Sequence, residues 1–281
     1  MEPRLEDIRE QQKATWNKFS RGWKKWDDLT MDFLKPNGDK IIQMLKLKET
    51  DMVLDIASGT GEPGLTIASL VKHGKVTLTD LSEDMLEIAR EKASKRGIKN
   101  IETRVCDVCE LPFPDSTFDV VSCRFGFMFF PDMLLAAKEM VRVLKPGGRI
   151  ATSVWNIPEK NFWVTAVGSI INRNMQLPAP PPDAPGMFRC AKSGLIVDIF
   201  KQAGLKKTSE TEVHGKLNSG TKEAYWNMMT EVAAPFAAAL SKADDHMKSK
   251  IESEVFDLVD QKFPDGNVLI DSSALVIYGE K

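Results

Sequence analysis

The chain has 281 residues, of which 42% are hydrophobic and 28% charged, a composition typical of a soluble globular protein. Its formal net charge of −2 shows no excess of basic residues, which argues against nucleic acid as the main partner. The amino terminus, MEPRLEDIRE, is polar and acidic, and no apolar run is long enough to span a bilayer. We therefore expect no secretory signal, no integral membrane segment and a cytoplasmic location.

The four cysteines do not indicate a disulfide framework. Cys106 and Cys109 form a CxxC, but no second pair follows at zinc-binding spacing, so we expect no metal site. Unpaired cysteines are ordinary in a reducing compartment.

Residues 5–34 are predicted to be helical, with four aromatic rings on one face. Trp16, Phe19, Trp23 and Trp26 are spaced three, four and three residues apart. This face either docks the helix on the core or covers a ligand pocket, and the two interpretations are compatible. Phe19 and Trp23 are the candidates for the rings nearest a ligand.

A second helix is expected at 39–47, followed by a buried strand that leads into a glycine-rich loop. The strand is Val53–Ala57, the loop continues to Gly64, and a helix follows from Leu65. This arrangement lets backbone approach a ligand at a helix N-terminus, where a Cβ would block the approach. The letters GTGEPG match GxGxxG, the dinucleotide fingerprint, so NAD is one candidate ligand.

Asp55 argues against a dinucleotide. It lies inside the strand, four residues before Gly59, where a carboxylate suits an ammonium group better than a pyrophosphate. If the loop binds nothing, this buried carboxylate needs another partner. The pattern D-x-x-x-G-x-G resembles the first motif of the class I S-adenosylmethionine-dependent methyltransferases. The resemblance implies that Asp55 faces the methionine ammonium, directly or through water, with Ala57, Gly59 and Gly61 lying along the cofactor.

The next predicted strand, Val76–Asp80, ends in a second acid, 19 residues after Gly61. A carboxylate at this point can accept both ribose hydroxyls of either adenosylmethionine or NAD, so it does not separate the two ligands. Leu81 and Met85 are placed to touch the adenosine, although packing alone explains Met85.

A third predicted strand, Ile101–Val105, is followed by Asp107 and Val108. In the family, an acid here hydrogen-bonds the adenine amino group, and the backbone N–H of the next residue meets a ring nitrogen. An isolated aspartate in a loop would by default be a surface residue. Asp107 is counted as a candidate because it is the third acid to follow three successive strands.

Two further phrases are typical of the family. LPFPDSTFD leads into the fourth strand, Val120–Arg124, and RVLKPGGR separates a helix from the fifth strand, Arg149–Trp155. Arg124 lies at the carboxyl end of its strand, beside the sulfonium and methyl group in the family. We count it among the cofactor-binding candidates, where it either orients a substrate oxygen or pairs with a nearby acid.

The resemblance covers most of residues 15–155, and the group it indicates includes the ubiquinone/menaquinone-biosynthesis methyltransferases. Five strand–helix units with near-continuous apolar strands imply an α/β fold with a doubly wound, mostly parallel sheet, for which we expect seven strands. The last strand, 267–278, is expected to return antiparallel to the sheet edge. We expect a helical lid at 1–34, a cofactor-binding core at 35–155, and substrate-lid helices with the last two strands at 156–281.

The expected function is methyl transfer from S-adenosylmethionine to a small acceptor by in-line displacement. Large apolar side chains in the last part of the chain favour an apolar or aromatic acceptor. Two alternatives stay open, an NAD-dependent oxidoreductase and an adenosylmethionine-binding protein without transfer activity. The sequence predicts neither a catalytic residue nor an oligomeric state.

Overall fold

A seven-stranded sheet runs through the protein, whose computed structural model describes residues 5–177, 181 and 184–281. The strand order is β3-β2-β1-β4-β5-β7-β6. The strands are β1 (Met52–Ile56), β2 (Lys75–Asp80), β3 (Ile101–Val105), β4 (Phe118–Arg124), β5 (Leu144–Trp155), β6 (Lys206–Gly220) and β7 (Val268–Glu280). Neighbours from β3 to β5 pair in parallel, whereas β7 is antiparallel to both β5 and β6. This confirms the predicted doubly wound sheet and its antiparallel last strand. The predicted place of that strand at the sheet edge is wrong, because β7 pairs with β5 on one side and with β6, the edge strand, on the other.

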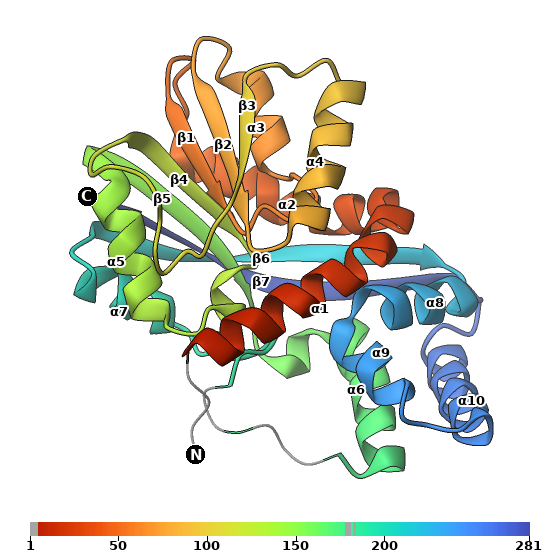
Figure 1. Ribbon diagram of the computed structural model, residues 1–281. Coiled ribbons are helices and arrows are strands. Elements are labelled where there is room, and N and C mark those ends of the chain that lie inside the picture. The colour runs from red at the N-terminus through yellow and green to blue at the C-terminus, as the bar shows by residue number, and fades with distance from the viewer. Residues whose placement is uncertain (1–4, 178–180, 182–183) are drawn as a thin grey trace.

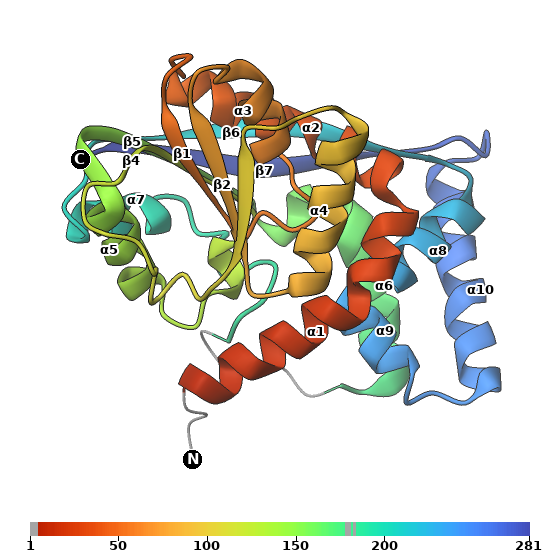
Figure 2. The ribbon, with the colours of Figure 1, turned by 45° about the horizontal axis from the view of Figure 1, so that its top comes forward.

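Ten α-helices of the described residues surround the sheet (Figure 1). They are α1 (Leu5–Lys25), α2 (Asp27–Leu45), α3 (Gly64–Leu70), α4 (Glu83–Lys95), α5 (Met133–Val143), α6 (Phe162–Met175), α7 (Leu195–Gln202), α8 (Lys222–Val232), α9 (Ala234–Leu240) and α10 (Asp245–Lys262). Short 3₁₀ helices lie at Phe127–Phe129 and Pro158–Lys160. Figure 2 shows α6, α8, α9 and α10 gathered at one end, away from α5 and α7.

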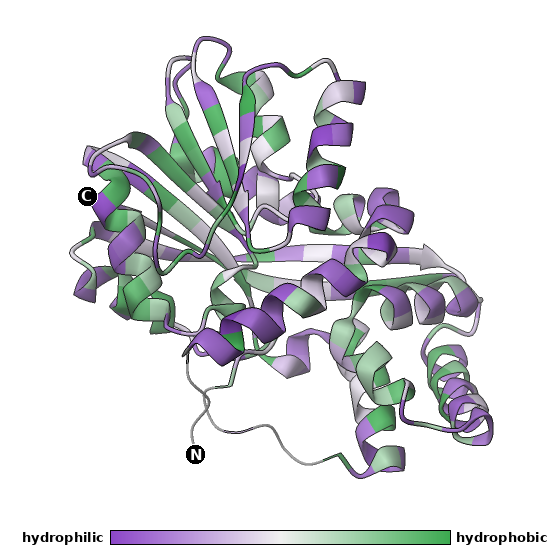
Figure 3. Ribbon diagram, in the orientation of Figure 1, coloured by the Kyte–Doolittle hydropathy of each residue, from purple (hydrophilic) through white to green (hydrophobic). Residues whose placement is uncertain are grey.

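Two clusters of buried apolar side chains hold these layers together. One joins α2, α3 and α4 to the sheet, and the larger one joins α5, α6, α7, α8 and α10 to it. Figure 3 shows apolar residues concentrated along the central strands, while α1 is largely hydrophilic with apolar positions between. The sheet core is therefore buried on both faces, as parallel strands require.

The break between the first two helices lies at Trp26, so the predicted gap between residues 34 and 39 is wrong. Helix α2 continues through Pro36, which by itself favours a helix end. Its stripe of Phe33, Ile41 and Leu45 is buried against the sheet, and this packing outweighs the local cost of the proline.

The KPGG segment is not a simple turn either. Strand β5 begins at Leu144, opposite Phe118, and the pairing resumes only at Val120 with Arg149. The intervening residues form an irregularity in the strand where Gly147 takes a φ of +74° and donates its N–H to the Lys281 carbonyl. The last residue of the chain is thereby fixed to the edge of the core.

Among the described residues, no helix is long and apolar enough to cross a bilayer. Likewise, no group of three or more metal-ligating side chains comes together in the described ranges. All four cysteines are free thiols.

Candidate active site

The glycine-rich loop after β1 has backbone conformations that side chains rarely tolerate. Gly59 and Gly61 have φ angles of +52° and +106°, and Ala57 also takes a positive φ of +51°. A Cβ on Gly64 would lie 2.7 Å from a carboxylate oxygen of Asp55, so only glycine fits between the loop and the strand. A Cβ on Gly59 would meet nothing within 4 Å, which leaves space beside this backbone for a ligand.

Asp55 lies beneath this loop and is completely buried, with 0% of its surface exposed. Its carboxylate accepts a 2.5 Å hydrogen bond from the Ser122 hydroxyl and a 3.2 Å bond from the Gly64 N–H. Burial raises the pKa of Asp55 to about 7, against the opposing effects of Ser122 and the Arg124 charge. The buried carboxylate therefore has protein partners of its own, and it ties the glycine loop to β4.

Asp80 ends β2 and holds the other side of the loop. Its two carboxylate oxygens accept 2.9 Å hydrogen bonds from the backbone N–H groups of Gly59 and Ser82. Burial raises the pKa of Asp80, although these N–H donors oppose the shift. Since a carboxylate offers about four acceptor positions, acceptor capacity remains for a ligand.

Asp107 follows β3, the strand beside β2, so the three predicted acids lie along one edge of the sheet. One oxygen of Asp107 accepts a 2.9 Å bond from the Cys109 N–H, and the other lies 3.6 Å from an Arg9 guanidinium nitrogen. Val108 and Met85 are buried near these strand ends, and Leu81 is partly exposed.

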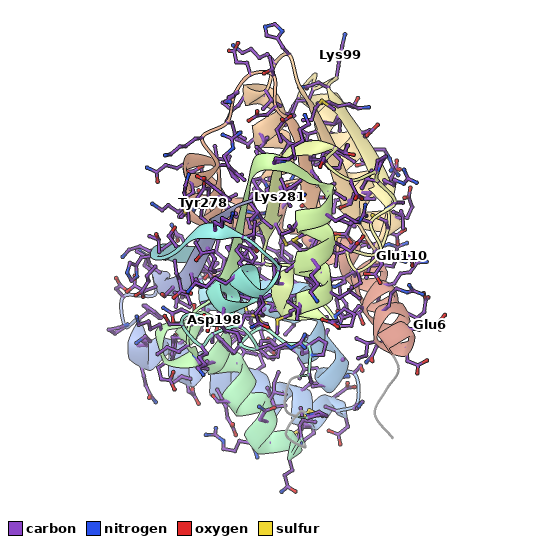
Figure 4. All side chains as sticks on the ribbon, turned by 90° about the vertical axis from the view of Figure 1, so that its left-hand side faces the viewer. Glu6, Lys99, Glu110, Asp198, Tyr278 and Lys281 are labelled. Carbon is purple, nitrogen blue, oxygen red and sulfur yellow. The ribbon has the colours of Figure 1, made fainter. Side chains whose placement is uncertain are left out.

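Helix α1 crosses this edge (Figure 1). Figure 4 shows Glu6 of α1 on the side of Glu110, after β3, with Lys99, before β3, at the far end of the molecule. Arg9 reaches Asp107, and Asn17 accepts a 2.5 Å hydrogen bond from the Ser82 hydroxyl. The helix therefore lies over the carboxyl ends of β2 and β3.

The aromatic side chains of α1 contact different parts of the protein. Trp16 lies edge-on to Phe129, with ring centroids 5.2 Å apart, in the segment that follows β4. Trp23 packs against the larger core cluster, and its indole N–H has no partner among the described residues. Phe19 is partly exposed, with the Lys18 ammonium 5.7 Å from its ring. Trp16 and Trp23 lie edge-on, with ring centroids 6.5 Å apart, as their spacing predicts. Trp26 instead lies in the break between α1 and α2, so the four rings do not share one helix face. The spacing does not single out Trp16 as the ring that meets the β4 segment.

Arg124 lies at the end of β4 and is part-buried. Its guanidinium donates to the Met31 sulfur at 3.4 Å and forms no ion pair with a described residue, so it does not pair with a nearby acid. Burial lowers the pKa of Arg124, while the negative charges of Glu62, Asp55 and Asp27 raise it.

A cluster of four aromatic rings fills the space beyond the ends of β4 and β5. Phe125 stacks on Trp155 with centroids 4.2 Å apart, and Phe33 stacks on the same ring at 5.7 Å. Trp163 lies 4.8 Å from Trp155, and its indole N–H donates to Asn161. Phe125 takes a positive φ of +61°, a strained conformation of the kind that clusters at functional sites.

The model of the ubiE/COQ5 methyltransferase family matches residues 21–162, half of the chain. The chain belongs to the ubiE/COQ5 methyltransferase family. Its members use S-adenosylmethionine as the methyl donor, and the matched range contains β1 to β5 with all three acids. This confirms the family that the sequence motifs indicate.

Relatives of this family resemble the chain to different extents. A demethylmenaquinone methyltransferase from Listeria monocytogenes is 39% identical over 121 residues, which cover 42% of this chain and 51% of that protein. One from Bacillus subtilis is 32% identical over 184 residues, or 60% and 76% of the two proteins. The chain thus spans about half the length of the first of these relatives.

A solved structure, a SAM-dependent methyltransferase from Aquifex aeolicus, superposes with a TM-score of 0.54 at 26% sequence identity. The match covers 69% of this chain and 92% of that one. It confirms the α/β methyltransferase fold.

The site of this ubiE/COQ5 family member fits adenosylmethionine. The space beside Gly59 and the spare acceptors of Asp80 suit a ribose, while Asp107 after β3 offers an acceptor to an amino group. Sequence reasoning missed the contacts that Ser122, Asn17 and Arg9 make with these groups. For Ser122 the signal was present, since β1 and β4 pair directly and Ser122 lies opposite Asp55.

Proposed function

We propose that the protein transfers a methyl group from S-adenosylmethionine to a small, planar, quinone-type acceptor. The observation that supports the acceptor class is the ring of Phe125, the one partly exposed member of an aromatic cluster whose other rings, Phe33, Trp155 and Trp163, are buried. It adjoins the end of β4, the strand that also carries Ser122 and Arg124. Stacked rings suit a flat aromatic molecule, and the relatives named above are demethylmenaquinone methyltransferases.

We assign the cofactor contacts along the row of acids. Asp80 accepts hydrogen bonds from the ribose hydroxyls, and Asp107 accepts one from the adenine amino group. The Val108 N–H donates to a nitrogen of the adenine ring. Asp55 supplies the negative charge beneath the methionine ammonium, through the loop that it supports. Backbone of the loop and apolar side chains complete the cofactor surface, in the set Ala57, Gly59, Gly61, Leu81 and Met85.

Helix α1 serves as the lid over this surface. Its contacts reach the proposed adenosine end, through Arg9 to Asp107 and through Asn17 to Ser82, whose backbone N–H donates to Asp80. Trp16, Phe19 and Trp23 supply its apolar face. Because these contacts lie where the cofactor binds, lid closure and cofactor binding stabilise each other.

The chain performs the reaction by positioning and by excluding water, rather than by a dedicated base. The bound donor would supply a methyl group on a sulfonium, whose sulfur leaves as a neutral thioether. The acceptor would react in its reduced, electron-rich form and release one proton to solvent as its bond to the methyl group forms. All three histidines are exposed, and His214 lies within 3.8 Å of Glu212 rather than at the strand ends. The buried Tyr225 donates its hydroxyl to the Trp163 carbonyl at 2.5 Å and so supports the aromatic cluster. Orientation of the acceptor against the methyl group is then the main contribution of the protein.

Methyl transfer is tested with methyl-deuterated adenosylmethionine and a panel of quinones and their reduced forms. We expect a product whose mass carries the deuterated methyl group, formed from a quinone-type acceptor and not from simple phenols or amines. Binding of adenosylhomocysteine without a labelled product would instead indicate a binding protein, and a labelled amine would contradict the acceptor class.

A further inference from the structure

Arg124 is the last residue of β4 and lies two residues after Ser122, the residue that donates a hydrogen bond to Asp55. Ser122 lies opposite Asp55 in the sheet and donates to its carboxylate. Side chains two residues apart on a strand point to the same face, so Arg124 follows Ser122 on the face of Asp55. A buried negative charge and a positive charge are thereby placed in succession toward the carboxyl edge of the sheet.

The acids around Arg124 each have another partner. Asp27 pairs with the Lys92 ammonium at 2.8 Å, and Glu62 pairs with Arg96. Asp55 accepts from Ser122 and Gly64. The guanidinium has five N–H donors, yet its one hydrogen bond within the described residues goes to a thioether sulfur at 3.4 Å. A part-buried arginine with unused donors beside a ligand loop is suited to an anionic oxygen pair.

We propose that Arg124 binds the carboxylate at the amino-acid end of adenosylmethionine. This inference rests on the proposed function. The amino-acid end is a zwitterion, and the chain offers it a matching pair of charges, Asp55 for the ammonium and Arg124 for the carboxylate. The planar guanidinium can hold both carboxylate oxygens at once, which fixes the direction of the methionine chain and hence of the methyl group. The proposed role of Arg124 is therefore to orient the cofactor.

The test compares two ligands that differ only in this carboxylate. Calorimetry measures the binding of adenosylhomocysteine and of its decarboxylated analogue to the wild-type protein, Arg124→Met, Arg124→Lys and a control, Arg173→Met. Arg173 is an exposed residue of α6 that pairs with Glu254. We expect Arg124→Met to weaken adenosylhomocysteine roughly 10- to 100-fold and to leave the analogue unchanged. Arg124→Lys should lose less, because it keeps the charge, and the control should match the wild type.

Four results would overturn the inference. Equal weakening of both ligands in Arg124→Met would mean that the arginine supports the fold of the site rather than the carboxylate. Unchanged adenosylhomocysteine binding with a raised KM for the acceptor would assign Arg124 to an acceptor oxygen. If Arg124→Met does not fold, equal wild-type affinities for the two ligands would contradict the inference by themselves. Absence of any adenosylhomocysteine binding in the wild type would contradict the proposed function as well.

Discussion

The hydroxyl of Ser82 joins α1 to the start of α4 by donating a 2.5 Å hydrogen bond to the side-chain oxygen of Asn17. The same hydroxyl caps α4, since it accepts a bond from the Met85 N–H at 3.2 Å. Ser82 also donates its backbone N–H to Asp80. One residue thus connects α1, the cap of α4 and the proposed ribose acceptor, Asp80, so the position of α1 depends on the geometry around this carboxylate.

Asn17→Ala should loosen the lid without unfolding the core. Loss of a single hydrogen bond removes about 0.5–1.5 kcal/mol of docking free energy. In the wild type we expect amide hydrogens of residues 10–28 to exchange quickly in the free protein and slowly with adenosylhomocysteine, because terminal helices open first. The variant should exchange faster in both states. Thr15→Ala is the matched control, since Thr15 bonds only within its own helix; exchange that does not respond to ligand would argue that α1 is plain core packing.

Asp80→Ala should weaken adenosylhomocysteine by about 2–4 kcal/mol, because two charge-assisted hydrogen bonds to the ribose are lost. Calorimetry measures this change, with Asp115→Ala as a control at an exposed acid that pairs with Arg142. The melting temperature of the free variant must be recorded too, since Asp80 also accepts the Gly59 and Ser82 N–H groups. Wild-type affinity in a folded variant would mean that the ribose is held by other residues.

The raised pKa of Asp55 makes both stability and ligand binding depend on pH. Because the folded-state pKa of about 7 exceeds the unfolded value of 3.8, the folded protein holds the proton more tightly, and stability falls as pH rises from about 4 to 7. The full effect is about 4 kcal/mol. The cationic ammonium of the ligand binds more tightly to the ionised form of Asp55, and the ionised fraction falls about tenfold between pH 8 and pH 6. Adenosylhomocysteine should therefore bind about tenfold more weakly at pH 6 than at pH 8. Asp55→Asn should abolish both trends, and a variant that keeps them would show that another group titrates.

Phe125→Leu should raise the KM for the acceptor while leaving the dissociation constant of adenosylhomocysteine unchanged. The partly exposed Phe125 ring is held in place by stacking on Trp155 at 4.2 Å. An aromatic pair between Phe125 and the acceptor would contribute about 0.5–1.5 kcal/mol, which corresponds to roughly a 2- to 10-fold change in KM. Steady-state kinetics with the best acceptor of the panel provides the measurement. Phe113→Leu removes a comparable ring pair, that with Phe118, away from the site. Equal effects of the two substitutions on KM would contradict an acceptor role for Phe125.

Much of the core was predictable because its signals are local. A pattern of only a few residues predicts the first strand, the glycine loop and each of the acids Asp55, Asp80 and Asp107. Parallel strands then bring their carboxyl ends to one edge of the sheet. The direction of the last strand was predictable too, but its place between β5 and β6 was not. These features place the candidate site at the edge of the sheet where the carboxyl ends of β1, β2 and β3 meet.

Long-range pairings were not predictable from one sequence. Nothing near Asn17 indicates Ser82, and nothing near Arg9 indicates Asp107, since each pair forms only when α1 lies across the sheet edge. The helix break was misplaced because Pro36 is a strong local signal, whereas the packing of Phe33 and Ile41 that outweighs it is tertiary. The aromatic cluster joins rings from α2, β5 and α6 with Phe125, and no periodicity connects those segments.

The melting temperature with adenosylhomocysteine and with NAD tests the central assignment of the glycine loop most directly. A ligand at 100 times its dissociation constant stabilises the folded state by about 2.7 kcal/mol. For a domain of this size we expect a rise of about 5–10 °C with adenosylhomocysteine and none with NAD. A rise with NAD alone would contradict the methyltransferase account, because the loop would then bind a dinucleotide in spite of Asp55.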